Sequence, residues 1–175
     1  YTLWHTLSLH DALPISHMRF RRMGGPASGL GVLSRTPLQR VQWLPPKHGA
    51  HGSLRVQARL GRREVQVVNV HLYPTLPRAE DSPREVLQRY ARAEHIRRRE
   101  IEHVHAKLSD KQPAILLGDL NCVGGLGGQA CRHLRARGFV DSFASVHERP
   151  NAHPTFHIRP DAPATAGFRL DYIYH

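Results

Sequence analysis

A short apolar run that ends at a glycine and is followed by an acid and an amide constrains this chain most. Residues 113–118, PAILLG, are too few for a typical helix, so they predict a buried strand. Asp119 and Asn121 follow, and side chains two residues apart project to the same side of a strand. Both can therefore face one phosphate or one hard cation. The alternative is an Asx turn that merely ends the strand, because both residue types bond their own backbone.

Two further segments place polar residues on predicted strands. Residues 67–72, VVNVHL, predict a second buried strand with His71 near its end and Asn69 two residues earlier. Residues 168–174, FRLDYIY, predict a third strand that bears Asp171. The chain thus carries an imidazole, two carboxylates and two amides on three strands of similar character.

The order of these motifs resembles that of the endonuclease/exonuclease/phosphatase superfamily, which includes exonuclease III-like and deoxyribonuclease I-like enzymes. The matching strings are NVHL, GDLN and RLDYI, and residues 29–38, GLGVLSRTPL, resemble a further strand-and-turn motif of the family. Each string alone is a weak signal, but four in the right order form a specific one. The resemblance runs from about Gly29 to His175.

This resemblance implies an α/β fold in which two mixed β-sheets pack face to face as a sandwich with flanking helices, four layers in all. It also implies hydrolysis of a phosphoester with Mg²⁺ or Mn²⁺ as the cofactor. Asp119 would activate the attacking water and bind metal, and Asn121 would hold the phosphate or a metal-bound oxygen. His71 would donate a proton or stabilise the developing charge. Asn69 would position the substrate, and Asp171 would be the fourth catalytic residue.

The sequence departs from the family pattern at both ends. Family members carry a metal-binding glutamate upstream of the first motif, and no candidate precedes Gly29. They also end in a Ser-Asp-His motif, whose histidine Asp171 would orient, but this chain stops at His175. We therefore expect residues 17–175 to form a partial, incomplete domain with impaired catalysis.

Residues 1–16, YTLWHTLSLHDALPIS, share no periodicity with the rest of the chain and resemble translated sequencing adaptor. We expect this segment to be non-native and exclude it from the fold. The alternative is an amphipathic N-terminal helix. The segment has neither the charged start nor the small-residue cleavage site of a signal peptide.

The positions of turns and caps predict the connections between these strands. Residues 53–60 and 64–72 predict an antiparallel hairpin that turns at residues 61–63. The preceding segment, marked by a Pro-Pro pair and two glycines, predicts a connecting loop. Its two histidines, His48 and His51, are interpreted as exposed loop residues rather than as a metal site.

One long and one short helix are predicted. Ser82 begins the long one, because SPRE combines a capping box with proline at the first helical position. It is expected to run to about Leu108, with its apolar face on a sheet and with Arg97 and neighbouring arginines facing solvent. Residues 129–137 predict the short helix, which Gly138 closes.

Composition bears on partners and location. The chain has 25 lysines and arginines against 14 acids, a formal charge of +11, which favours phosphate-rich partners such as nucleic acid, although a coding bias toward arginine explains it equally well. It has no apolar run long enough for a transmembrane segment. The two cysteines, Cys122 and Cys131, match no metal spacing. We expect a cytoplasmic monomer with reduced thiols.

Three functional interpretations stay open. The first is a nuclease or phosphodiesterase that acts on nucleic acid, and the charge favours it. The second is a hydrolase of the same fold that acts on a lipid head group or a small phosphoester. The third is a non-catalytic, basic nucleic-acid-binding domain. Thr155 and Phe156 lie in a late segment that resembles the family and are interpreted as structural residues or substrate contacts.

Overall fold

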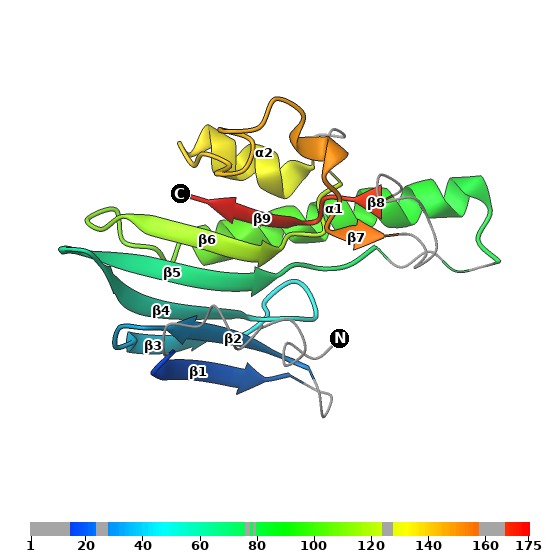
Figure 1. The fold of residues 1–175 in the computed structure, drawn as a ribbon. Coiled ribbons are helices and arrows are strands. Elements are labelled where there is room, and N and C mark those ends of the chain that lie inside the picture. Colours follow the sequence, from blue (N-terminus) through cyan, green and yellow to red (C-terminus); the bar gives the residue numbers. More distant parts are fainter. Residues whose placement is uncertain (1–14, 24–27, 76–77, 79, 124–127, 158–166) are drawn as a thin grey trace.

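The structure is a computed structural model that describes residues 15–23, 28–75, 78, 80–123, 128–157 and 167–175. Its elements form an α/β fold with strands in three sheets (Figure 1). In chain order they are β1 His17–Arg22, β2 Gly29–Ser34, β3 Gln39–Leu44, β4 Ser53–Leu60, β5 Arg63–His71, α1 Pro83–His105, β6 Ala114–Asp119, α2 Gln129–Ala136, the 3-10 turn Pro150–Ala152, β7 Phe156–His157, β8 Gly167–Phe168 and β9 Asp171–Tyr174.

The main sheet has five strands in the order β3-β4-β5-β6-β9. Only β5 and β6 pair in parallel, and the long helix α1 provides the crossover between them. The other neighbours pair antiparallel, so the sheet is mixed, as the sequence predicted. The strands β1 and β2 form a second, two-stranded sheet, and β7 and β8 form a short ribbon.

Each face of the main sheet is covered by a different layer. Even-numbered residues of β5, such as Val68 and Val70, pack with α1, α2 and the tyrosines of β9. Odd-numbered residues, such as Val65 and Val67, pack against Leu30 of β2. The described residues therefore form three of the four expected layers: a small sheet, the main sheet and a helical layer (Figure 1). Two sheets packed face to face confirm the predicted sandwich class, which is incomplete here.

Helix α1 begins at the predicted capping box. The Ser82 side chain accepts from the backbone N–H of Glu85, and the Glu85 carboxylate accepts from the backbone N–H of Ser82. The prediction that Arg97 faces solvent is wrong, because its side chain is fully buried. Arg97 lies on the same stripe as Ala93 and Ile101, four residues to either side, so the geometry of the helix directs it inward.

The bounds of several strands differ from those that the sequence predicted. The hairpin turn contains only residues 61 and 62, because Arg63 already pairs with Leu60. The predicted loop before β4 begins with strand β3, which pairs with the first half of β4. No strand was predicted at β1, which pairs along its length with β2. Cys122 and Cys131 are both buried and not in a disulfide bond. Residues 1–14 lie outside the described part of the chain, so the interpretation of the N-terminal segment stays a prediction.

Candidate active site

Three of the predicted site residues meet at one end of the main sheet. His71 pairs with Asp119 in the register of β5 and β6, and Asp119 pairs with Asp171 in the register of β6 and β9. The end of β5, the end of β6 and the start of β9 coincide at this edge (Figure 1). All three side chains belong to the alternation on the face of the main sheet opposite the helices, where His71 and Asp119 are half-buried and Asp171 is exposed. His71 Nε2 lies 3.8 Å from Asp119 Oδ2.

The glycine that precedes Asp119 lets the two strands come together here. Gly118 has a φ of +125°, and a Cβ at this position would lie 2.1 Å from the carbonyl oxygen of Val70. Any amino acid with a Cβ would clash with this carbonyl oxygen, so only glycine lets the two backbones come so close. The glycine in GDLN is therefore needed to place the carboxylate of Asp119 beside His71.

Asp119 and Asn121 form the Asx turn that the sequence left as an alternative, and the carboxylate of Asp119 also lies beside His71. The Asp119 Oδ1 atom accepts a 2.7 Å hydrogen bond from the backbone N–H of Asn121, whose φ is +50°. Asn121 Nδ2 donates to the carbonyl oxygen of Leu72 at 2.9 Å. This turn leaves Asp119 Oδ2 facing His71 and ties the end of β6 to the end of β5.

Burial sets the ionisation of the pair. It raises the pKa of Asp119 to about 6, and the nearby carboxylate of Asp171 acts in the same direction, while the hydrogen bond from Asn121 opposes the rise. Burial also lowers the pKa of His71, which keeps this imidazole neutral at pH 7. A half-buried carboxylate that titrates close to neutrality, beside a neutral imidazole, is suited to proton transfer.

The remaining predicted residues make supporting contacts. Asn69 lies at the same face as His71, and its Nδ2 donates to the carbonyl oxygen of Gly31 at 2.9 Å, which links the main sheet to β2. Thr155 Oγ1 accepts from the backbone N–H groups of Leu170 and Asp171, each at 3.1 Å. The contact of Thr155 seen here is therefore with the backbone that carries Asp171.

Sequence reasoning missed His51. Its imidazole is half-buried and stacks on that of His71, with ring centroids 4.3 Å apart and ring planes 12° apart. Its interpretation as an exposed loop histidine is therefore wrong. Only the adjacency of a loop to the end of β5 could have revealed this contact, and no local pattern encodes that adjacency.

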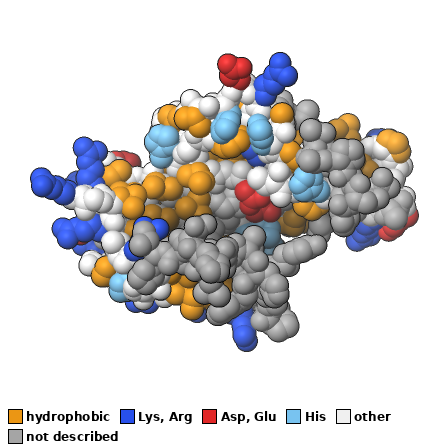
Figure 2. Space-filling view, viewed as in Figure 1, with side chains coloured by type: hydrophobic (Ala, Val, Ile, Leu, Met, Phe, Trp, Pro, Cys, Tyr) orange, Lys and Arg blue, Asp and Glu red, His pale blue; other side chains and the backbone are white. Residues whose placement is uncertain are grey.

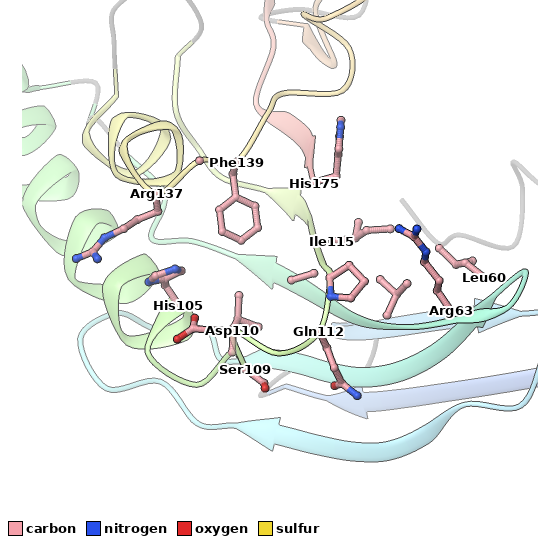
Figure 3. A pocket seen from close by; sticks show the side chains of 15 residues that line it. Leu60, Arg63, His105, Ser109, Asp110, Gln112, Ile115, Arg137, Phe139 and His175 are labelled. Carbon is pink, nitrogen blue, oxygen red and sulfur yellow. The ribbon is translucent and has the colours of Figure 1, made fainter.

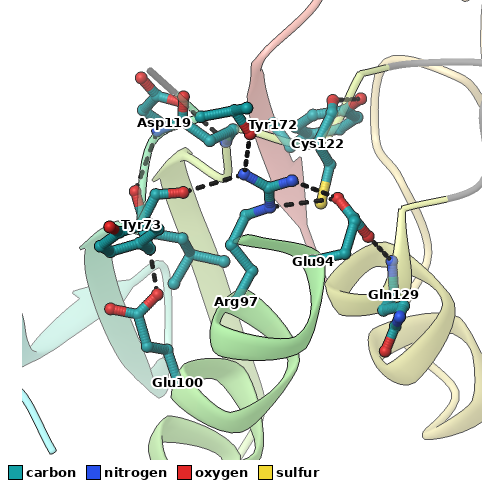
Figure 4. A network of polar contacts seen from close by, with 11 residues as sticks. Tyr73, Glu94, Arg97, Glu100, Asp119, Cys122, Gln129 and Tyr172 are labelled. Carbon is teal, nitrogen blue, oxygen red and sulfur yellow. Dashed lines mark hydrogen bonds and ion pairs between the residues drawn. The ribbon is translucent and has the colours of Figure 1, made fainter. Parts of the chain in front are cut away.

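Behind the site lies a buried polar network centred on Arg97 (Figure 4). Its guanidinium forms an ion pair with Glu94 and donates to the carbonyl oxygen of Tyr73 at 3.0 Å and to Thr75 Oγ1 at 2.9 Å. The Glu94 carboxylate also accepts from the backbone N–H of Gln129, the first residue of α2. One ion pair thus joins both helices to the segment that leaves the site after β5.

A second buried ion pair supports β9. Arg169, two residues before Asp171, pairs with Asp141, and its guanidinium lies 4.2 Å from the centre of the Tyr172 ring. The Tyr172 hydroxyl donates to the carbonyl oxygen of Cys122 at 2.8 Å. Together with the hydrogen bond from the Leu120 N–H to the carbonyl oxygen of Leu170, this contact binds RLDYI to GDLN and the residue after it without their proposed catalytic groups.

A pocket of about 470 Å³ lies at the other end of the same strands. Figure 3 shows His105 and Arg137 on one side of it and Arg63 on the other. Lysines and arginines gather at that end too, where β4 turns into β5 (Figure 2), and include Arg59 and Arg62. Neither the pocket nor this basic end contributes to the edge that holds Asp119.

The fold and this edge define a class: an α/β sandwich that presents carboxylates and a histidine where its strands end. A family model described as "Endonuclease/Exonuclease/phosphatase family" matches residues 2–175, and the chain belongs to that family. Members of this family are hydrolases that act on phosphoesters. A search among curated proteins gave no match. No helix in the described ranges is long and apolar enough to cross a bilayer.

Solved structures agree on the fold. An endonuclease/exonuclease/phosphatase from Beutenbergia cavernae superposes with a TM-score of 0.65 at 19% identity, covering 91% of this chain and 46% of that one. An AP endonuclease from Archaeoglobus fulgidus gives 0.58 at 16%, covering 90% and 65%. Sphingomyelinase C from Streptomyces griseocarneus gives 0.55 at 20%, covering 88% and 56%. The chain thus spans about half to two thirds of their length.

Proposed function

We propose that this protein is a divalent-metal-dependent phosphodiesterase that acts on nucleic acid. One observation carries the proposal: in a chain of this family, Asp119 lies between His71 and Asp171 on three neighbouring strands at a single edge. Hydrolysis of a phosphodiester needs an activated water, neutralised phosphate charge and a stabilised leaving oxygen. A carboxylate and an imidazole at one edge suit the first and third of these needs.

The oxygen donors at this edge fit a hard cation. No group of three or more His, Cys, Asp or Glu side chains suited to a metal occurs within the described ranges. Mg²⁺ does not require one, because it is commonly held by one or two carboxylates and takes its other ligands from water and substrate phosphate. Asp119 and the amide oxygen of Asn121 would hold it, and the ion would neutralise phosphate charge when bound.

The roles of the chain's own groups follow from their ionisation. Above pH 6, Asp119 is largely ionised and can accept a proton from water through Oδ2. His71 can donate a hydrogen bond to the phosphate, because its Nε2 faces the same space as Asp119 Oδ2. Asp171 adds negative charge beside Asp119, and Thr155 sets the position of its backbone. Asn69 holds the end of β5 against β2.

Two observations favour nucleic acid over a lipid head group. The formal charge of +11 attracts polyphosphates, although it does not discriminate among them. Phe156 and Phe168 pair across the ribbon of β7 and β8 and are 52% and 39% exposed. Phe168 is three residues before Asp171, and Phe156 follows Thr155, whose hydroxyl accepts from the backbone N–H of Asp171. Exposed aromatic rings beside a phosphate site are suited to stacking with unpaired bases. Structural neighbours carry the names of both an AP endonuclease and a sphingomyelinase, so hydrolysis of a lipid head group is the second candidate.

The decisive test compares Asp119→Asn with a matched control, Asp110→Asn, an exposed acid near the pocket at the other end of the sheet. We expect cleavage of bis(p-nitrophenyl) phosphate and of a single-stranded oligonucleotide only with Mg²⁺ or Mn²⁺. Asp119→Asn is expected to lower kcat at least about 100-fold, the usual contribution of a catalytic proton acceptor, and Asp110→Asn to leave it unchanged. Undiminished activity of Asp119→Asn, or activity in EDTA, would contradict the proposal. Turnover of sphingomyelin vesicles but not of the oligonucleotide would select the second candidate.

A further inference from the structure

We propose that His51 is a positioning residue of this site: its ring stacks on the His71 imidazole and fixes the plane in which that imidazole meets Asp119. The inference deepens the proposed function and rests on it, since the orientation of His71 matters to catalysis only if His71 takes part. Nothing in the family motifs NVHL, GDLN or RLDYI includes His51.

The stack with His51 is the contact available to orient His71. Neither ring nitrogen of His71 forms a hydrogen bond with any residue that the structure describes, and its distance of 3.8 Å from Asp119 exceeds hydrogen-bond length. An imidazole without such a bond can rotate about its side-chain torsions. His51 covers one face of the ring, nearly parallel and at 4.3 Å between centroids, and so restricts that rotation.

The loop that carries His51 is itself held in place by close packing on both sides of this residue. A Cβ at Gly49 would lie 1.7 Å from a carboxylate oxygen of Glu100, and a Cβ at Gly52 would lie 2.3 Å from the Trp43 ring. The loop therefore passes against α1 on one side of His51 and against β3 on the other. Glu100 also accepts a 2.8 Å hydrogen bond from the backbone N–H of Tyr73, two residues after His71. The loop thus packs against the same carboxylate that accepts from the segment after β5.

The residues around the two stacked rings are closely packed. His51, His71 and Glu100 line a common hollow of only about 10 Å³, which holds at most one water molecule. The other histidine of this loop, His48, instead lies 6.5 Å, edge to face, from His103 of α1 and is not among the residues that line this hollow. His48 can therefore serve as the control for His51, because it lies on the same loop but does not line this hollow.

The test uses the full chain and three variants: His51→Ala, which removes the stack; His51→Phe, which keeps a flat ring without nitrogens; and His48→Ala as the matched control. The first readout needs no substrate. In a ¹³C-resolved NMR spectrum, the Hε1 resonance of His71 is expected to move downfield in His51→Ala, because it loses the shielding of the stacked ring. It should stay near its original position in His51→Phe and His48→Ala.

The second readout is hydrolysis of bis(p-nitrophenyl) phosphate with Mg²⁺. Misorientation of a catalytic group costs up to about 100-fold, so we expect kcat of His51→Ala to fall about 10- to 100-fold with little change in KM. His51→Phe should recover most of that loss. An unmoved His71 resonance in His51→Ala would overturn the inference. So would a His51→Phe variant that keeps the resonance yet is as slow as His51→Ala, because the His51 nitrogens would then act directly. If the parent protein shows no metal-dependent activity, the proposed function fails, and the NMR result alone decides whether His51 orients His71.

Discussion

Contacts with other residues set the positions of Asp119, Asp171 and His71 at the strand ends. The backbone N–H of Asn121 holds one oxygen of Asp119, and the hydroxyl of Thr155 holds the backbone at Asp171. His51 covers His71. The same residue can therefore end a strand as an Asx turn and present a second oxygen to a site. The Asx turn that the sequence left as an alternative uses Asp119 Oδ1, and the proposed site uses Asp119 Oδ2, which faces His71.

Glu100 provides a prediction of pH dependence at the residue scale. Burial raises the pKa of this carboxyl to about 7 from an ordinary value of 4.5, and its Oε1 has no hydrogen-bond partner. Between these pH values the folded state binds more protons than the unfolded state, so this residue makes stability fall as pH rises. Glu100→Gln should remove that fall. From pH 5 to pH 8 it should gain about 3 kcal/mol relative to the parent, at 1.36 kcal/mol for each unit of pKa.

Urea unfolding at pH 5 and pH 8 measures this difference. The matched control is Glu85→Gln on the same helix, because the hydrogen bonds from Ser82 lower the pKa of Glu85. The stability that Glu85 contributes is lost only as pH falls below about 4.5, so its substitution should give the same change at pH 5 and pH 8. Equal behaviour of the two variants would show that Glu100 is ionised in the fold at pH 5.

At the scale of elements, the sequence predicted those strands and helix ends that depend on residues close together in the chain. The apolar runs of β5 and β6, the hairpin of β4 and β5 and the capped start of α1 are confirmed. Strand β3 was missed because its exposed face and the Pro-Pro pair after it are typical of a loop. The burial of Arg97 was missed because its charge outweighed its place on the buried stripe of the helix. What made that burial stable was a carboxylate three residues away and carbonyl and hydroxyl acceptors beyond β5, contacts that helical periodicity does not encode.

The ion pair of Arg97 and Glu94 yields a prediction for the packing of the two helices. Arg97→Met should lower the free energy of unfolding by about 3 to 5 kcal/mol, because Glu94 is left as an unpaired buried charge. The double variant Glu94→Gln/Arg97→Met should recover much of that loss, since Gln can still accept from the backbone of Gln129. Arg98→Met, next along the helix, should change it by less than about 1 kcal/mol, because its pair with Glu102 is exposed.

Urea unfolding at pH 7, followed by far-UV circular dichroism, measures these differences. The comparison with Arg98→Met separates the burial of a charge from the loss of an arginine. If Arg97→Met were no less stable than Arg98→Met, the network in Figure 4 would not hold the helices together.

At the scale of the whole molecule, the basic turn between β4 and β5 and the candidate site lie at opposite ends of β5. The exposed arginines at the turn of β4 and β5 lie eight residues along β5 from His71, roughly 26 Å at 3.3 Å per residue. These arginines therefore add no positive charge at the candidate site. At 0.15 M ionic strength, charges that far apart are screened, because the Debye length is about 8 Å, whereas at 0.01 M it is about 30 Å. The basic end can attract a polyanion to the site only at low salt.

This separation predicts how binding of a single-stranded oligonucleotide responds to charge. In an Asp119→Asn background, which prevents cleavage, substituting Arg59, Arg62 and Arg63 by Gln should slow association at about 0.01 M salt and leave it nearly unchanged at 0.15 M. Stopped-flow fluorescence with a labelled oligonucleotide measures both rates, and the corresponding Lys substitutions, which keep the charge, should behave like the parent. If the Gln variant were equally slow at 0.15 M, the substrate would have to extend along the sheet to the basic end. Binding of nucleic acid would then involve the basic end as well as the edge that holds Asp119.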